Sequence, residues 1–296
     1  ITYSDFDKNG VLDIVEYHRD KLTGKLVPER GRSCSTRAMP FIGERNESFN
    51  VFGERSLEEV YGECLKEGKV LEANVLEHTL FINREGKFEA RALPIEAQFS
   101  PVFGLNIADF NNDGKEDVFV AQNFFASQRE TPRSDGGRGL LMLGDGEGGL
   151  ETISGIESGI EVYGEQRGSA VSDFNQDGRP DIIITQNGAL ARLYQNKEAR
   201  SGLRIKLNAG TANPTGVGAA VRLVWEGGKL GPARLIAAGS GYWSQDSAVQ
   251  VLGSPKGIKP THLEVRWPGG KNTRTEIPKD SKEVQIGSDG KLISSK

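Results

Sequence analysis

Residues 109–117 read Asp-Phe-Asn-Asn-Asp-Gly-Lys-Glu-Asp and lead directly into the apolar run Val-Phe-Val at 118–120. The same acidic pattern stands at 5–13 (Asp-Phe-Asp-Lys-Asn-Gly-Val-Leu-Asp) and at 173–181 (Asp-Phe-Asn-Gln-Asp-Gly-Arg-Pro-Asp), where apolar β-branched residues again follow. A segment that recurs in this way marks a repeated structural unit. The pattern predicts three copies of a strand, a nine-residue acidic loop and a second strand.

The oxygen-bearing side chains of these loops are spaced for a hard cation. Calcium takes six to eight oxygen ligands in a flexible shell, and side chains at loop positions 1, 3, 5 and 9 converge if the backbone curls around one point. The carbonyl at position 7 supplies a further oxygen, and the glycine at position 6 allows a positive φ. The absence of thiolate and imidazole groups disfavours zinc and copper. The predicted calcium ligands are Asp5, Asp7, Asn9, Val11, Asp13, Asp109, Asn111, Asp113, Lys115, Asp117, Asp173, Asn175, Asp177, Arg179 and Asp181.

The acidic loops have two other possible interpretations. One copy alone reads as a polar turn, since Asp, Asn and Gly favour turns, but three copies in one register are hard to explain in that way. The first copy also has EF-hand spacing, with Glu16 at position 12, which would favour an intracellular calcium sensor. Val120 and Ile184 occupy that position in the other copies. We therefore interpret all three as one β-type loop, with Glu16 as a coincidence or an extra ligand.

The motif D-F-N-x-D-G-x-x-D before a short apolar strand resembles the FG-GAP (VCBS-type) repeat of integrin-like β-propellers. This resemblance implies an all-β fold, here a partial β-propeller, with one calcium loop in each blade. The loops start 104 residues apart (5 to 109) and then 64 apart (109 to 173), whereas a blade takes about 40–60 residues. We therefore expect an inserted loop and helix segment at about 26–73. A closed propeller needs about four to eight blades, so we expect further blades upstream of this chain.

Further strands and one helix are predicted around the loops. Residues 79–83 and 88–90 flank a turn, as do 140–143 and the segment after Gly146, so each pair predicts a hairpin. Ser56 and Glu59 form a capping box for a short helix through Leu65. Cys34 and Cys64 both fall in the insertion, where a disulfide and two free thiols are both compatible with the sequence.

The carboxy-terminal region is predicted to be a small antiparallel β domain. Alternating or apolar strands are expected at 203–207, 220–225, 233–237, 262–267 and 283–286. Three segments resemble the ASPIC/UnbV domain that follows FG-GAP repeats in cartilage-acidic-protein-like secreted proteins: 216–221, 239–245 (Gly-Ser-Gly-Tyr-Trp-Ser-Gln) and 265–271. The predicted division is therefore 1–200 for the blades, 202–288 for this domain and 289–296 for a tail. Tyr242 and Trp243 suit sugar or peptide contacts, although packing of both rings between strands is the favoured interpretation.

Composition narrows the function classes. No apolar run approaches the roughly 18–20 residues of a membrane span, and the formal net charge of −4 comes without a basic stripe, so neither a transmembrane helix nor nucleic-acid binding is expected. Calcium sites of extracellular modules bind at about 0.1–1 mM. The sequence therefore favours a secreted or cell-surface protein, with the periplasm as an alternative location. We expect it to act without catalysis in recognition or adhesion of a protein or glycan ligand.

An extracellular enzyme is the alternative hypothesis. A polysaccharide lyase or hydrolase can be built on a propeller, with its site partly in upstream blades. The three histidines, His18, His78 and His262, stand in no metal or triad pattern, and no acid/base pair of carboxylates is evident. The expectation of a non-enzymatic protein rests on these observations.

Overall fold

The computed structural model describes residues 1–127 and 130–296. Contacts divide the chain into two compact units, one formed by Ile1–Leu76 with Ser127–Pro132 and the other by Glu77–Ala126 with Arg133–Lys296. The division between blades and carboxy-terminal domain near residue 200 remains a prediction. No helix in the described ranges combines the length and the apolar character that crossing a bilayer would require.

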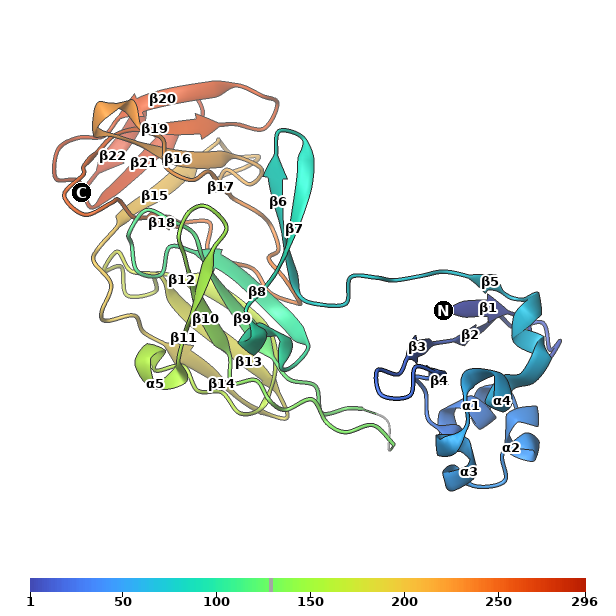
Figure 1. Ribbon diagram of the computed structural model, residues 1–296. Helices are drawn as coiled ribbons and strands as arrows, with labels where there is room; N and C mark the ends of the chain where they lie inside the picture. The colour runs from blue at the N-terminus through green and yellow to red at the C-terminus, as the bar shows by residue number, and fades with distance from the viewer. Residues whose placement is uncertain (128–129) are drawn as a thin grey trace. The chain divides into compact units, whose positions relative to one another are not determined.

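The first unit joins small antiparallel sheets to four short helices (Figure 1). Strands β2, β1 and β5 form one sheet in that order, and β3 pairs with β4. The elements are β1 (Thr2–Ser4), β2 (Asp13–Val15), β3 (Tyr17–Arg19), β4 (Leu26–Pro28), α1 (Arg32–Ala38), α2 (Phe41–Arg45), α3 (Phe49–Glu54), α4 (Leu57–Tyr61), the 3₁₀ helix η1 (Gly62–Glu67) and β5 (Lys69–Val70).

Helix α4 confirms the predicted helix start. The Ser56 side chain accepts from the Glu59 amide, the Glu59 carboxylate accepts from the Ser56 amide, and η1 continues the coil beyond Tyr61. Helices α1, α2 and α3 were not predicted, because segments of five to seven residues are too short to show a 3.6-residue period. Apolar side chains of α2, α3 and α4 pack with Met39 and the strand residue Val15 in one core, which consists of Val15, Met39, Ile42, Phe52, Leu57, Val60 and Tyr61.

The second unit contains two antiparallel sheets whose strands follow one another in chain order. One sheet has the order β11-β10-β9-β8 and the next has β12-β13-β14. Both predicted hairpins are confirmed, as β6–β7 and β10–β11. The elements are β6 (Thr79–Arg84), β7 (Lys87–Ala92), the 3₁₀ helix η2 (Ile95–Gln98), β8 (Val102–Ala108), β9 (Asp117–Gln122), β10 (Leu140–Gly144), β11 (Leu150–Ile153), α5 (Gly155–Ser158), β12 (Glu165–Ser172), β13 (Asp181–Asn187) and β14 (Ala189–Tyr194).

These two sheets share an apolar core. Alternate residues of β9 and β13 point into it, with Phe119, Ala121, Ile182 and Ile184 all buried. Phe110, the second residue of an acidic loop, lies in the same cluster. The burial of this loop residue ties the conformation of the second acidic loop to the packing of the sheets.

The carboxy-terminal part of the second unit is a pair of four-stranded sheets, β18-β15-β21-β22 and β17-β16-β19-β20. The predicted all-antiparallel arrangement is wrong at one place, because β15 pairs with β21 in parallel. The sequence pattern of a strand does not depend on the direction of its partner, so this pairing was not visible in it. The bounds are β15 (Leu203–Asn208), β16 (Ala220–Trp225), the 3₁₀ turn η3 (Glu226–Gly228), β17 (Arg234–Leu235), β18 (Gln250–Leu252), β19 (Pro260–Arg266), β20 (Asn272–Glu276), β21 (Glu283–Gly287) and β22 (Leu292–Ser295).

The largest apolar cluster lies between those two sheets. It includes Ile205, Leu223, Leu263, Trp225 and Trp267, all of them buried. The last strand, β22, falls in residues 289–296, which the sequence assigned to a tail, and it pairs with β21. The chain is thus mostly β-strand in several small sheets with few helices, as the predicted fold class requires at that coarser level.

Candidate functional site

Each acidic loop connects two antiparallel strands. The first connects β1 to β2, the second β8 to β9, and the third β12 to β13. A strand rather than a helix follows the first loop, so the EF-hand interpretation is wrong for 5–16. The Glu16 carboxylate pairs with Arg30 instead. The interpretation of all three as one β-type loop is confirmed.

The three loops share one hydrogen-bond scheme around the carboxylate at position 1. Its two oxygens accept from the backbone amides of positions 5 and 6, at 2.8–3.0 Å. The donors are Asn9 and Gly10 to Asp5, Asp113 and Gly114 to Asp109, and Asp177 and Gly178 to Asp173. The position-1 carboxylate of every loop therefore turns toward the interior of its own loop.

The remaining side-chain oxygens repeat across the loops as well. The position-3 oxygen accepts from the amide of position 5, the position-5 oxygen from the amide of position 7, and the position-9 carboxylate from the amide of position 2. The acceptors are Asp7, Asn9 and Asp13 in the first loop, Asn111, Asp113 and Asp117 in the second, and Asn175, Asp177 and Asp181 in the third. All twelve predicted side-chain ligands thus face inward.

Two backbone positions hold this curled shape in each loop. Position 4 has a positive φ near 60° at Lys8, Asn112 and Gln176, and position 6 has a positive φ of 81–90° at its glycine. At Gly114 a Cβ atom would lie 2.9 Å from both Trp225 and Pro255. Glycine is thus required there for its conformation and for space.

Negative charge is concentrated in the loops. In the first loop, one oxygen from each of Asp5, Asp7 and Asp13 lies within 4.8 Å of the others; no second group of three reaches this spacing in residues 1–127 and 130–296. In the second loop, burial raises the pKa of Asp109 to about 6. Burial, together with the Asp109 charge, raises the pKa of Asp117 to about 7. A cation between these groups would remove the cost of keeping them ionised.

Basic side chains approach the loops unequally. In the third loop the Arg204 guanidinium pairs with Asp173, and Arg179 Nη1 lies 3.0 Å from the Asp177 carboxylate. In the second loop Lys115 Nζ lies 3.9 Å from the Asp113 carboxylate, and Arg234 pairs with Glu116, which is not a predicted ligand. The first loop carries no ion pair to its carboxylates within the residues that the structure describes.

The donor set of the loops fits calcium. Every predicted side-chain ligand is a carboxylate or an amide oxygen, which suits a hard cation. In the described part of the chain, the backbone carbonyls of Val11, Lys115 and Arg179 accept no hydrogen bond, so this seventh-position oxygen is available in each loop. These residues could hold a divalent ion, which would supply charge neutralisation and a rigid crosslink within the loop.

The second and third loops contact each other and the carboxy-terminal region. The Asn112 side chain donates to the carbonyls of Gly178 and Arg200, and Arg200 donates to the carbonyls of Asn112 and Ser254. The backbone of Gly253 passes so close to Asp109 that a Cβ atom there would lie 2.3 Å from its carboxylate. None of these contacts carries a sequence signal, because they join residues that are 54 to 144 positions apart.

The segment 239–247 lies against the first strands of both sheets. The Asp246 carboxylate accepts from the Val171 amide and from Asn106, while the Ser247 amide donates to the Val171 carbonyl. Burial raises the pKa of Asp246. This segment therefore joins the carboxy-terminal region to β8 and β12.

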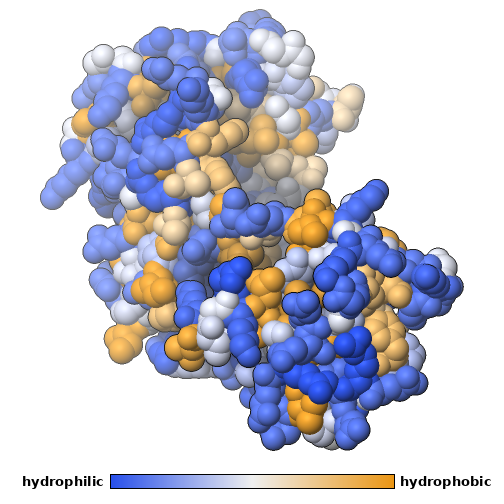
Figure 2. All heavy atoms as spheres, turned by 45° about the vertical axis from the view of Figure 1, so that its right-hand side comes forward, coloured by the Kyte–Doolittle hydropathy of each residue, from blue (hydrophilic) through white to orange (hydrophobic). Residues whose placement is uncertain are grey.

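The favoured interpretation of Tyr242 and Trp243 as rings packed between strands is wrong for Trp243, which is 91% exposed. Its φ of 51° is unusual for a large side chain. Tyr242 lies edge-on to Phe103, with ring centroids 5.8 Å apart, and Arg167 covers the Phe103 ring at 4.0 Å. Elsewhere, Figure 2 shows apolar side chains in small groups on a mostly polar surface.

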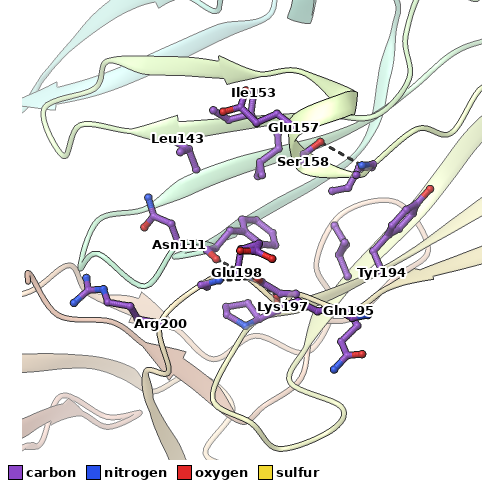
Figure 3. A pocket seen from close by; sticks show the side chains of 18 of the residues that line it. Asn111, Leu143, Ile153, Glu157, Ser158, Tyr194, Gln195, Lys197, Glu198 and Arg200 are labelled. Atoms are coloured by element: carbon purple, nitrogen blue, oxygen red, sulfur yellow. Dashed lines mark hydrogen bonds between the residues drawn. The ribbon is translucent and has the colours of Figure 1, made fainter.

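A separate cavity of about 520 Å³ opens between α5 and the turn after β14. Its apolar lining includes Phe110, Ile160 and Ile182. Figure 3 shows Glu157 and Ser158 on one side and Glu198 on the other. The volume is in the range of small-ligand pockets, and sequence patterns did not predict it.

Both cysteines are free thiols in the structure. Burial raises the pKa of Cys64, whose thiol donates to the Tyr61 carbonyl. A raised pKa disfavours the reactive thiolate.

These features define a β-rich protein with three acidic hairpin loops, two of them docked on a two-sheet carboxy-terminal region. Residues 209–292, within that region, match the family model described as ASPIC and UnbV. The chain is 29% identical over 206 residues to cartilage acidic protein 1 of Xenopus tropicalis, and 26% and 25% identical over 203 residues to the proteins of that name from Mus musculus and Homo sapiens. Each match covers 66% of this chain, which spans only 30% of the length of these relatives.

Proposed function

We propose that this chain is part of a secreted or cell-surface protein in which calcium stiffens a set of β-sheets that present a recognition surface, without catalysis. The observation that carries the proposal is the hydrogen-bond scheme shared by the three acidic loops, which turns the same set of oxygens inward each time. Calcium at about 0.1–1 mM fills extracellular sites of this type, so the proposed location and the proposed ligand agree. The similarity to cartilage acidic protein 1 supports the same class of protein.

We further infer that the sheets β8–β11 and β12–β14 are propeller blades of the FG-GAP type. Each runs as an antiparallel meander, each begins with a strand that leads into an acidic loop, and the two pack face to face through Phe119, Ile182 and Ile184. Calcium in the loop between the first two strands of a blade would fix the hairpin at the point where the carboxy-terminal region docks.

The recognition surface in this proposal is the aromatic patch formed by Phe103, Tyr242 and Trp243. An indole that is 91% exposed gains nothing from folding, whereas it offers a large flat face to a ligand. Arg167 places a guanidinium over the Phe103 ring, and Ser240 and Ser244 flank the two aromatic residues in the sequence. This combination suits a glycan, whose apolar faces stack on rings while its hydroxyl groups bond to polar side chains.

Calcium-dependent stability tests the first part of the proposal. A site with a Kd of about 0.1–1 mM stabilises the native state by about 1–2 kcal/mol at about 5 mM free calcium, so 5 mM CaCl2 should raise the melting temperature of the chain and a chelator should lower it. The substitution Asp117→Asn should weaken this response. The matched control is Asp145→Asn, which removes an aspartate from a β-hairpin turn outside the three loops. A melting temperature unchanged by both calcium and chelator would contradict the proposal.

Glycan-array binding with calcium present tests the recognition surface. The substitution Trp243→Ala should abolish binding while leaving the melting temperature unchanged, because the side chain buries almost no area. Turnover of any polysaccharide by the wild-type chain would favour the enzyme instead. Binding that survives Trp243→Ala would place the recognition surface elsewhere.

A further inference from the structure

The third acidic loop already contains a built-in counter-cation. The Arg204 side chain, on β15, is 7% exposed and lies against the Asp173 carboxylate, which is 1% exposed. Arg204 Nη1 donates to both an Asp173 carboxylate oxygen and the Asp173 backbone carbonyl. Asp173 is the position-1 residue, the one whose two oxygens also accept from the Asp177 and Gly178 amides. The Arg204 guanidinium therefore already pairs with a carboxylate that a calcium ion in this loop would need as a ligand.

A second arginine approaches the same loop. Arg179 Nη1 lies 3.0 Å from the position-5 carboxylate of Asp177, and its Nε donates to the Ala199 carbonyl, which holds it in place. In the second loop, by contrast, Arg234 pairs with Glu116 at position 8, which is not a predicted ligand. The position-1 carboxylate Asp109 has no ion pair in the described residues. The three loops thus share one oxygen scheme but differ in the positive charge they already hold.

Resting on the proposed calcium function, we propose that Arg204 makes the third loop the weakest of the three calcium sites, so that calcium fills the first and second loops before the third. A dication entering the third loop must share Asp173 with the arginine or displace it from Asp173. Hydrogen bonds to charged groups contribute enough to stability that at least a tenfold difference in affinity is expected. Because β15 belongs to the carboxy-terminal region, filling of the third loop is coupled to the attachment of this region.

The contacts of Arg204 also provide a matched control. Arg204 Nε lies 3.0 Å from Glu283, and Lys206, two residues along the same strand, lies 2.9 Å from that carboxylate. Lys206→Gln therefore removes one positive charge and one Glu283 contact without touching Asp173. Arg204→Gln removes the same charge and also frees Asp173, while Lys206 remains to pair with Glu283.

Site-resolved calcium titration tests the proposal. The amides of Gly10, Gly114 and Gly178 each donate to the position-1 carboxylate of their own loop, so their resonances in a ¹⁵N-glycine-labelled chain report on each loop separately. In the wild-type chain, Gly178 should shift last as CaCl2 is added. In Arg204→Gln, the midpoint for Gly178 should fall at least tenfold, whereas those for Gly10 and Gly114 stay unchanged, as should all three in Lys206→Gln.

The outcomes separate the two proposals. If the three amides respond at one common calcium concentration in the wild-type chain, or if the Gly178 midpoint does not move in Arg204→Gln, the role of Arg204 is wrong while calcium binding stands. If none of the three amide resonances shifts and calorimetry detects no heat of calcium binding, the proposed function itself fails. Should Arg204→Gln not fold without calcium, the order of the three midpoints in the wild-type chain still tests whether the third loop is the weakest site. Arg204→Lys, which keeps the charge, should stay within about threefold of wild type.

Discussion

In the absence of calcium, the chain should lose stability as the pH rises from 5 to 8, which is the reverse of ordinary acid denaturation. A carboxyl whose pKa is higher in the folded than in the unfolded state binds more protons when folded. Its contribution to stability is therefore complete below the unfolded pKa and is lost as the pH rises through the folded one. Burial raises the pKa of Asp109 from 3.8 to about 6 and that of Asp117 to about 7.

The magnitude follows from these values. For each pH unit over which the carboxyl is protonated in the folded state but ionised in the unfolded state, the free energy of unfolding falls by about 1.4 kcal/mol. Above pH 5 this gives about 1.4 kcal/mol for Asp109 and about 2.7 kcal/mol for Asp117. Because the repulsion between the two groups raises the pKa of Asp117, simple addition counts part of it twice, and the expected total loss is about 2–4 kcal/mol. Burial raises the pKa of Asp181 and Asp246 in the same direction.

Guanidinium unfolding at pH 5, 6, 7 and 8 in metal-free buffer measures this loss. With 5 mM CaCl2 the trend should reverse, since calcium binds the ionised carboxylates and releases their protons. The double variant Asp109→Asn/Asp117→Asn should lose most of the metal-free slope. Asp145→Asn should keep it, because hydrogen bonds from the Glu147 and Gly149 amides lower the pKa of Asp145. A metal-free free energy of unfolding that is flat or rises from pH 5 to pH 7 would refute the reasoning.

Two further substitutions, one of them with a matched control, test the packing argument. Gly114→Ala should destabilise the chain by about 2–4 kcal/mol in thermal melts, because left-handed backbone strain adds to overpacking against Trp225 and Pro255. Gly10→Ala is the control, since it stands at the equivalent position with open space around it and should show only the strain of about 1–2 kcal/mol. Equal losses in the two variants would mean that the contact of Gly114 with Trp225 and Pro255 is not tight. Trp267→Ala should cost about 3–5 kcal/mol because the ring is buried in the carboxy-terminal core, and a loss below about 1 kcal/mol would contradict that placement.

Local patterns predicted the hairpins and the loop shape well. The acidic loops depend on side-chain oxygens that bond to amides two to seven residues away and on glycine at position 6, so residue type and spacing determine them. The capping box at Ser56 is equally local. The three short helices before it were missed because their burial around Ile42 and Phe52 comes from tertiary packing rather than from a long amphipathic period.

The sequence by itself determined where the oxygen-rich loops lie and which residues face their interiors, because contacts within nine residues follow from spacing. Only the tertiary structure decided which charges surround them. Arg204 reaches Asp173 from 31 positions away, Arg234 reaches Glu116 from 118, and Trp243 is left on the surface. The energy of a buried carboxylate depends on every charge and dipole near it in space, and residues distant in the chain become its neighbours only when the sheets pack.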